Sequence, residues 1–132
     1  MALAKANLGF PIQIAAGTTS AVYSVSSGKT AYIRSIMIYN QTVGTANTGL
    51  AQTVQVYMVP NSAGSTGTGS TRNMIGRINL SADDTFFFDL QYPMTLQSTN
   101  DSILVYNEGS TGTGGTTNTS PVTAVVLGDR EA

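Results

Sequence analysis

The sequence predicts an all-β protein: an antiparallel β-sandwich of six to eight strands, with jelly-roll or immunoglobulin-like topology. Two observations predict this class. From Phe10 onward, short runs of β-branched and aromatic residues are divided by Gly, Ser, Thr and Asn, and no stretch has the spacing of a convincing helix. Because no helical crossover separates the runs, neighbouring strands are expected to pair antiparallel.

The first strongly patterned unit consists of two apolar runs, residues 21–25 (AVYSV) and 31–39 (AYIRSIMIY). Residues 26–29 (SSGK) lie between them and predict a hairpin turn. With strictly alternating side chains, the second run has Ile36 and Ile38 on one face and Ile33, Met37 and Tyr39 on the other. Because both faces are apolar, we expect this run to be a central strand.

Shorter runs predict the remaining strands. Residues 52–59 (QTVQVYMV) follow a polar loop at 40–51, alternate apolar with polar side chains and end at Pro60, as a half-buried strand does. Turns are expected at 81–84 and at Asn100-Asp101, with a break at Tyr92-Pro93. We expect the other strands at residues 73–80, 85–90, 94–96, 103–107 and 122–127.

Two segments, residues 61–72 and 109–120, are rich in Gly, Ser and Thr and hold too few apolar groups to pack a core. We therefore predict exposed loops there. At 132 residues the chain has room for a single domain. We expect an N-terminal arm at residues 1–9, the sandwich domain at 10–128 and a charged C-terminal tail at 129–132.

Charged residues make up only 10% of the chain, and 6 basic against 7 acidic residues leave a net charge of −1. So small a charge does little to keep copies apart, which favours self-association or attachment to a partner. The basic residues are scattered, so we expect no nucleic-acid binding. No apolar run approaches the roughly 20 residues that span a bilayer, and no signal-peptide pattern begins the chain. We therefore expect no membrane contact and a soluble protein made without export.

The chain contains no His and no Cys, which removes Ser-His-Asp, Cys-His and zinc-hydrolase chemistry. A pair of carboxylates could still act as acid and base, but Asp83, Asp84 and Asp101 fall where Asp is a favoured turn residue. We expect no enzyme activity, no cofactor and no metal site. A calcium ion held by Asp and loop carbonyls is left open, although no calcium-loop pattern is present.

The aromatic side chains bear on two kinds of contact. Phe86, Phe87 and Phe88 are successive, so at least one ring should point away from the core, toward a second sheet or another subunit. Exposed rings are also the usual platforms for sugars, but Trp is absent. We therefore favour packing in a core or an interface.

Two stretches, residues 15–25 (AAGTTSAVYSV) and 27–36 (SGKTAYIRSI), are similar to small β-sandwich structural proteins of tailed-bacteriophage virions. In those proteins, a strand and a Gly-Lys-Thr turn lead into a strand ending in Asn. A polar loop and a Val-rich strand ending in Val-Pro follow. Here Tyr39-Asn40 and residues 54–60 (VQVYMVP) keep that order, and the resemblance covers roughly residues 12 to 106.

The resemblance implies a copy-repeated part of a virus particle, and within that class we favour a capsid decoration (cement) protein. Such a protein is made in the host cytoplasm and bridges capsid subunits on the capsid surface. Its expected partners are the major capsid protein and copies of itself, as a homotrimer, a dimer or a monomer, with no small-molecule substrate. The expected contact residues are Leu3, Leu8, Phe10, Phe86, Phe87, Phe88, Thr111, Thr113 and Asn118.

Two alternatives stand beside this interpretation. A tail, collar or fibre-associated virion protein would share the fold and composition but would assemble around the tail axis. A carbohydrate-binding module would need exposed Tyr side chains in a groove.

Overall fold

The computed structural model describes residues 3–40, 51–62, 65–111, 117–118 and 121–131. Most of the predicted loop at 40–51 lies outside these residues. Within them the regular structure is β-strand throughout, which confirms the predicted class, and no helix is long and apolar enough to cross a membrane. The strands are, in chain order, β1 (Leu3–Asn7), β2 (Ile12–Ile14), β3 (Thr18–Ser24), β4 (Ala31–Asn40), β5 (Gln52–Val59), β6 (Asn61–Ser62), β7 (Ser65–Thr66), β8 (Met74–Leu80), β9 (Thr85–Leu96), β10 (Ser102–Thr111), β11 (Thr117–Asn118) and β12 (Val122–Glu131).

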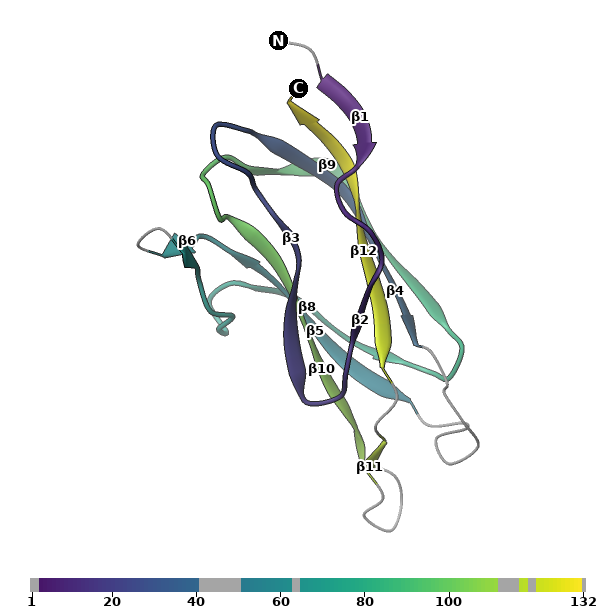
Figure 1. Cartoon of the computed structure of the whole chain (residues 1–132). Helices are drawn as coiled ribbons and strands as arrows, with labels where there is room; N and C mark the ends of the chain where they lie inside the picture. The colour runs from purple at the N-terminus through teal and green to yellow at the C-terminus, as the bar shows by residue number, and fades with distance from the viewer. Residues whose placement is uncertain (1–2, 41–50, 63–64, 112–116, 119–120, 132) are drawn as a thin grey trace.

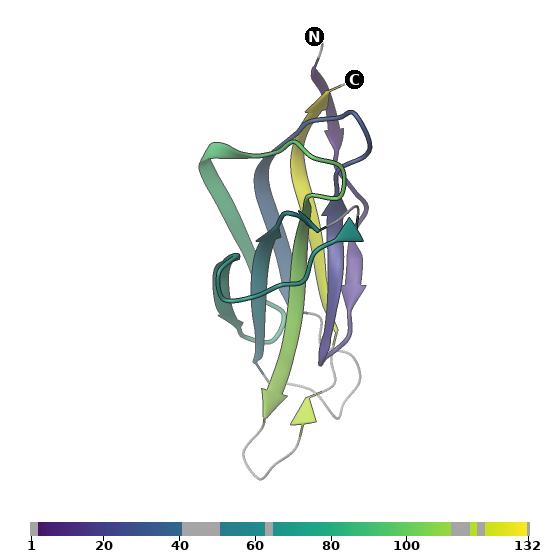
Figure 2. The same cartoon turned by 90° about the vertical axis from the view of Figure 1, so that its left-hand side faces the viewer.

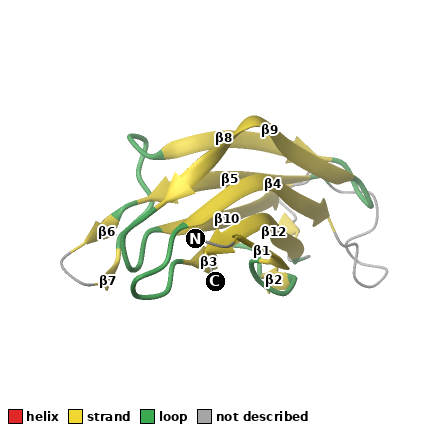
Figure 3. Ribbon diagram, turned by 90° about the horizontal axis from the view of Figure 1, so that it is seen from above, coloured by secondary structure: helices red, strands yellow, loops and turns green. Residues whose placement is uncertain are grey.

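Two antiparallel sheets pack face to face (Figures 1 and 2). Sheet A has the order β1-β12-β4-β9, and β2 follows β1 along the same edge of β12. Sheet B has the order β11-β10-β5-β8, and β3 lies beside β10. The hairpin of β6 and β7 projects to one side of the sandwich (Figure 3).

The pairing of the strands identifies the topology. If β1 and β2 count as one interrupted strand, the first strand pairs with the last, β3 with β10, β4 with β9, and β5 with β8. The chain is thus a long antiparallel ribbon, rolled so that β12 also meets β4 and β10 also meets β5. This order is that of a jelly roll, so the jelly roll is the correct one of the two predicted topologies.

The core lies between the two sheets and is filled by alternate residues of the strands on both sides. A Val or Ile side chain stabilises the fold by about 1.5 to 3 kcal/mol when it is fully buried. Those with no exposed surface include Ile14, Ala31, Ile33, Ile36, Ile38, Val122, Ala124 and Val126 from sheet A and Val54, Val56, Ile103 and Val105 from sheet B.

Strand β4 is central, between β12 and β9, as predicted, but strict alternation assigned Ile33 to the wrong face. Ile33 lies on the core side together with Ile36 and Ile38. Between Ile33 and Ser35 the register of β4 shifts against both of its neighbours, β9 and β12. One extra residue, Arg34, therefore forms a β-bulge that reverses the alternation.

Residues 26–29 form the predicted turn but not a hairpin. Gly28 has a φ of 69°, which favours glycine, and the Lys29 N–H donates to the Ser26 carbonyl at 3.2 Å. However, β3 belongs to sheet B and β4 to sheet A. The turn therefore carries the chain across the sandwich instead of joining two paired strands.

Several strands are longer than predicted. Strand β9 continues through Tyr92 and Pro93, and only its pairing with β4 is interrupted, between the pairs Ser35–Asp89 and Ile33–Met94. Strand β12 runs through the predicted charged tail, because residues 127–131 pair with residues 3–7 of the predicted arm. Residues 3–7 and 129–131 are therefore part of sheet A. The predicted loops at 61–72 and 109–120 contain the short pairings of β6 with β7 and of β10 with β11.

The bulge in β4 brings two backbones unusually close at Gly128. A Cβ on Gly128 would collide with the carbonyl oxygen of Tyr32. Beside it, the Arg34 Nε donates to Asp129 Oδ2 at 2.6 Å, so a largely buried carboxylate anchors the bulged residue to β12.

Replacing Gly128 by Ala should lower the free energy of unfolding by about 2 to 4 kcal/mol, because backbone must move to make room for the methyl group. Urea denaturation followed by circular dichroism measures the change. Gly76→Ala in β8 is the matched control, since its Cβ would only touch Phe88 at 3.4 Å. Equal stability of the Gly128→Ala and wild-type proteins would show that the close approach is wrong.

Asp101 ties three segments together at one end of the sandwich. Its Oδ1 accepts the Asn61 N–H at 2.8 Å, and its Oδ2 accepts the N–H groups of Gln97 and Ser98 at 3.2 and 2.9 Å. Burial raises the pKa of Asp101, but these three backbone N–H groups outweigh it and leave the pKa below its usual value.

Asp101→Asn should cost about 1 to 3 kcal/mol of stability at pH 7, because an amide NH₂ would face backbone donors. Since the folded-state pKa is lowered, the carboxylate's contribution is complete above the unfolded value of about 3.9 and is lost as the pH falls through the folded value. The difference in free energy of unfolding between the variant and the wild type should therefore be smaller at pH 3 than at pH 7. Unfolding curves at both pH values test this, with the exposed Asp84→Asn as control; a difference of the same size at pH 3 would contradict it.

Candidate interaction surfaces

The predicted contact residues lie in different environments. Leu8 is buried in the core, so its side chain is not available to a partner. Phe10, between β1 and β2, is 87% exposed. Leu3 begins β1, Thr111 ends β10 and Asn118 ends β11, while Thr113 lies outside the described residues.

The three successive phenylalanines divide as the alternation of a strand requires. Phe86 and Phe88 pack partly against the core, with ring centroids 6.3 Å apart. Phe87 points the other way and is 54% exposed. This confirms that at least one of the three rings faces away from the core.

Phe87 extends an apolar row across the outer face of sheet A. Val125 of β12 pairs with Met37 of β4, and Met37 pairs with Phe87 of β9. Their neighbours Val126, Ile36 and Phe88 face the core, so these three side chains face outward. We call Val125, Met37 and Phe87 the outer apolar row. Val125 is buried at 5% exposure and Met37 is partly buried, so the row becomes accessible toward its β9 end, at Phe87 on an edge strand of the sheet.

The outer face of sheet B carries a second apolar cluster. Tyr57, Val59 and Leu104 are buried there, with Met74 and Tyr106 packed against them. They lie outside the sandwich core and beneath the chain that follows β7. A small satellite cluster of this kind is common under long loops.

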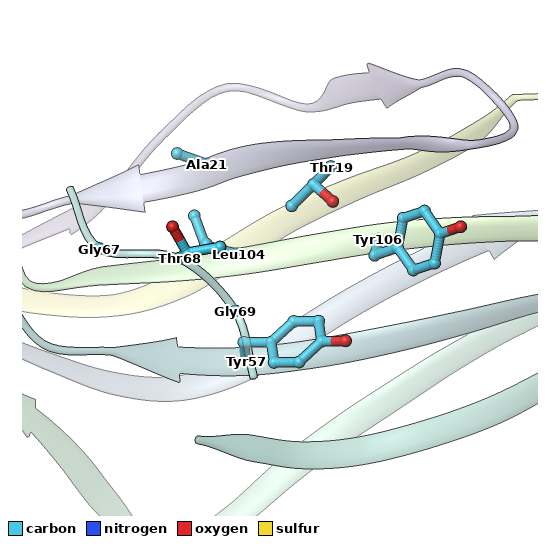
Figure 4. A pocket seen from close by; sticks show the side chains of 8 residues that line it. All are labelled: Thr19, Ala21, Tyr57, Gly67, Thr68, Gly69, Leu104 and Tyr106. Atoms are coloured by element: carbon cyan, nitrogen blue, oxygen red, sulfur yellow. The ribbon is translucent and has the colours of Figure 1, made fainter. Parts of the chain in front are cut away.

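A groove opens in this face, with a volume of about 370 Å³. Strand register forms its floor in two rows: Ala21, Leu104 and Tyr57 lie side by side across β3, β10 and β5, and Thr19 lies beside Tyr106 in the next row. Residues 67–69 cross over β10 and form one wall (Figure 4). The two tyrosine hydroxyls point toward the same end of the groove, away from that wall (Figure 4).

The wall is held by Asn73 and by a glycine. The Asn73 Oδ1 accepts the Ser70 N–H at 2.7 Å, its Nδ2 donates to the Thr68 carbonyl at 3.3 Å, and its own carbonyl accepts the Met58 N–H at 2.9 Å. Gly69 lies against the ring of Tyr57, where a Cβ would be only 3.0 Å from Cγ. Only glycine therefore lets the loop close onto the ring without displacing it.

A chain of polar contacts borders the open end of the groove. Arg77 donates to Glu108 at 2.9 Å, Glu108 also accepts from the Gln55 amide, and Gln55 in turn accepts from the Tyr57 hydroxyl. Burial and, after it, the charge of Glu108 raise the pKa of Tyr57 above its ordinary value. The Tyr57 hydroxyl is thus protonated at neutral pH, and the two opposite charges nearest the groove neutralise each other.

Four of the acidic side chains accept hydrogen bonds from groups of the fold. Asp83 accepts from the Tyr39 hydroxyl, Asp89 from the Ser35 hydroxyl, and Asp101 and Glu108 have the partners given above. Within the described ranges, no three Asp or Glu side chains gather into a group that could hold a metal ion.

Two features of the sequence could have indicated this groove: the side-chain alternation in β10 and the Gly-rich segment at residues 61–72. Ile103 and Val105 face the core while Leu104 and Tyr106 face outward, so β10 is apolar on both sides. A strand apolar on both faces must be covered twice. Residues 67–69, with two glycines, are part of that second cover.

No protein-family model matches the chain, and no curated protein matches it. Among solved structures it is similar to a chain in a Nora virus structure, with 12% identity and a TM-score of 0.43, covering 98% of this chain and 60% of that one. It is also similar to a chain in the T13 viral particle of IBDV, with 8% identity and a TM-score of 0.40, covering 96% of this chain and 31% of that one. A chain in infectious bursal disease virus Gx strain is similar with 12% identity and a TM-score of 0.31, covering 98% of this chain and 38% of that one. This chain therefore spans 60% or less of the length of each, and all three structures are of viruses.

Proposed function

We propose that this chain is a structural protein of a virus particle, a decoration (cement) protein of a bacteriophage capsid. The observation that carries the proposal is the outer apolar row of Val125, Met37 and Phe87 on sheet A. In a free monomer, the exposed part of the Phe87 ring is in contact with water, and burying it against a partner would be favourable. Val125 is buried and Met37 is partly buried, so the Phe87 ring is the most accessible part of the row. An exposed aromatic ring that continues an apolar row on the face of a sheet is a candidate contact residue.

The composition supports the same role. Only 10% of the residues are charged, so a neighbouring subunit can cover this face without desolvating many unpaired ions. The jelly roll is also a common architecture of viral capsid domains, among other classes of protein. A rigid sandwich across the joint between two capsid subunits would bury surface on both, and repetition over the lattice would multiply a weak contact into firm attachment.

Phe87→Ser should weaken attachment of the protein to the capsid by roughly 10- to 100-fold, since one aromatic side chain contributes about 1.5 to 3 kcal/mol when buried. The residue is exposed, so the variant should fold normally. The experiment incubates particles that lack the protein with wild type or variant, and measures occupancy by cryo-electron microscopy and sedimentation. Decorated particles should also survive heating better than bare ones.

Tyr92→Ser is the matched control, because Tyr92 is an 80% exposed aromatic on the same strand but outside the row. It should bind like wild type. Density found only on the tail or collar would contradict the capsid role and support a tail, collar or fibre-associated protein instead. Unchanged occupancy of Phe87→Ser would reject the outer apolar row as the contact surface, and absence of the protein from particles would reject the virion role.

A further inference from the structure

The groove on sheet B lies on the opposite face of the sandwich from the outer apolar row, and its chemistry is different. Its lining has no charged side chain: it consists of Thr19, Ala21, Tyr57, Leu104, Tyr106 and the loop segment Gly67, Thr68 and Gly69. Its volume of about 370 Å³ falls within the range of pockets that hold small organic ligands. The lining itself thus selects for a neutral ligand of modest size.

The polar groups of the groove are hydroxyls. The hydroxyls of Thr19, Thr68 and Tyr106 have no hydrogen-bond partner within the part of the chain that the structure describes, and Thr19 and Thr68 are exposed. The Tyr57 hydroxyl donates to Gln55 and keeps its lone pairs free to accept. Each free hydroxyl can both donate and accept, which suits a ligand whose own groups do the same.

The apolar groups form a floor between these hydroxyls. Leu104 and Tyr57, only 5% and 8% exposed, lie side by side at the bottom with Ala21 on β3 next to Leu104, and the Tyr106 ring lies further along β10 (Figure 4). A sugar ring likewise combines apolar and hydroxyl surface, with C–H groups on its faces and hydroxyls around its rim. Tyrosine suits such a ligand because it offers an apolar ring with a polar tip.

Other ligand classes fit less well. A phosphate or carboxylate would find no cation in the lining, since Arg77 is engaged by Glu108. An added peptide strand needs the unpaired backbone of a sheet edge, whereas this groove lies on the face of the sheet across β3, β10 and β5, and not along the outer edge of β3.

We propose that this groove is a binding site for a neutral saccharide. The Tyr106 ring contacts the apolar face of a sugar ring, and the hydroxyls of Thr19, Thr68 and Tyr106 hydrogen-bond to its rim. The site makes the chain a glycan-binding protein in addition to a particle component, and it does not depend on the attachment proposed above.

The test titrates the full ¹⁵N-labelled chain with glucose, galactose, N-acetylglucosamine and their β-linked disaccharides, with glucuronic acid as a charged probe. At least one neutral sugar should shift the amide signals of residues 19–21, 57, 67–69 and 104–106, and glucuronic acid should bind more weakly. Tyr106→Ala should weaken binding at least about 10-fold. Ala21→Tyr, at an exposed position on β3, should fill the groove and abolish binding.

Tyr92→Ala is the matched control, a tyrosine removed from outside the groove, and should leave the affinity unchanged. Absence of shifts with every neutral sugar would overturn the proposal. So would shifts that persist in both Tyr106→Ala and Ala21→Tyr when the ¹⁵N spectra show both variants folded. Because the assay uses the isolated chain, its outcome is independent of whether the protein is found on particles.

Discussion

The sandwich depends on the position of β12 in the middle of sheet A. It is the last strand of the chain, yet it pairs with β4 on one side and with β1 and β2 on the other. Its residues Val122, Ala124 and Val126 are completely buried in the core. Without β12, the N-terminal strands would have no partner and β4 would become an edge. With no cysteine in the chain, no disulfide can substitute for this pairing, and the first and last strands must find each other across the whole sequence.

The local patterns that were predicted correctly are those set by neighbouring residues. Alternation identified β5, a long run that is apolar on both faces identified β4 as a central strand, and Gly28 marked a turn. What could not be predicted depends on partners far away in sequence. The bulge at Arg34 is required by the pairing of β4 with β12 and β9. One extra residue cannot be recognised from the pattern of apolar residues in a strand that is apolar on both faces. For the same reason, the turn at Gly28 was read as a hairpin, although its two strands find their partners elsewhere.

The candidate surfaces show the same division. Alternation within one strand predicted that at least one ring of residues 86–88 faces outward, and the structure identifies it as Phe87. Leu8 was expected at the surface because the pattern around it is weak, but β1 and β2 carry it into the core along β12. The groove escaped prediction because its floor comes from three strands, β3, β5 and β10, that are adjacent only in the folded sheet. Its wall comes from a Gly-rich segment that, on composition alone, reads as a solvent-exposed connection.

A two-layer sandwich has two outward faces, and here they differ in chemistry. The outer face of sheet A has the apolar row that ends at Phe87, which suits a flat contact with another protein. The outer face of sheet B has a hydroxyl-lined groove walled by residues 67–69, which suits a small neutral ligand. Because the two faces are back to back, attachment through sheet A would turn sheet B outward. The two proposed contacts therefore do not compete for one surface, and a single small domain can hold both without any moving part.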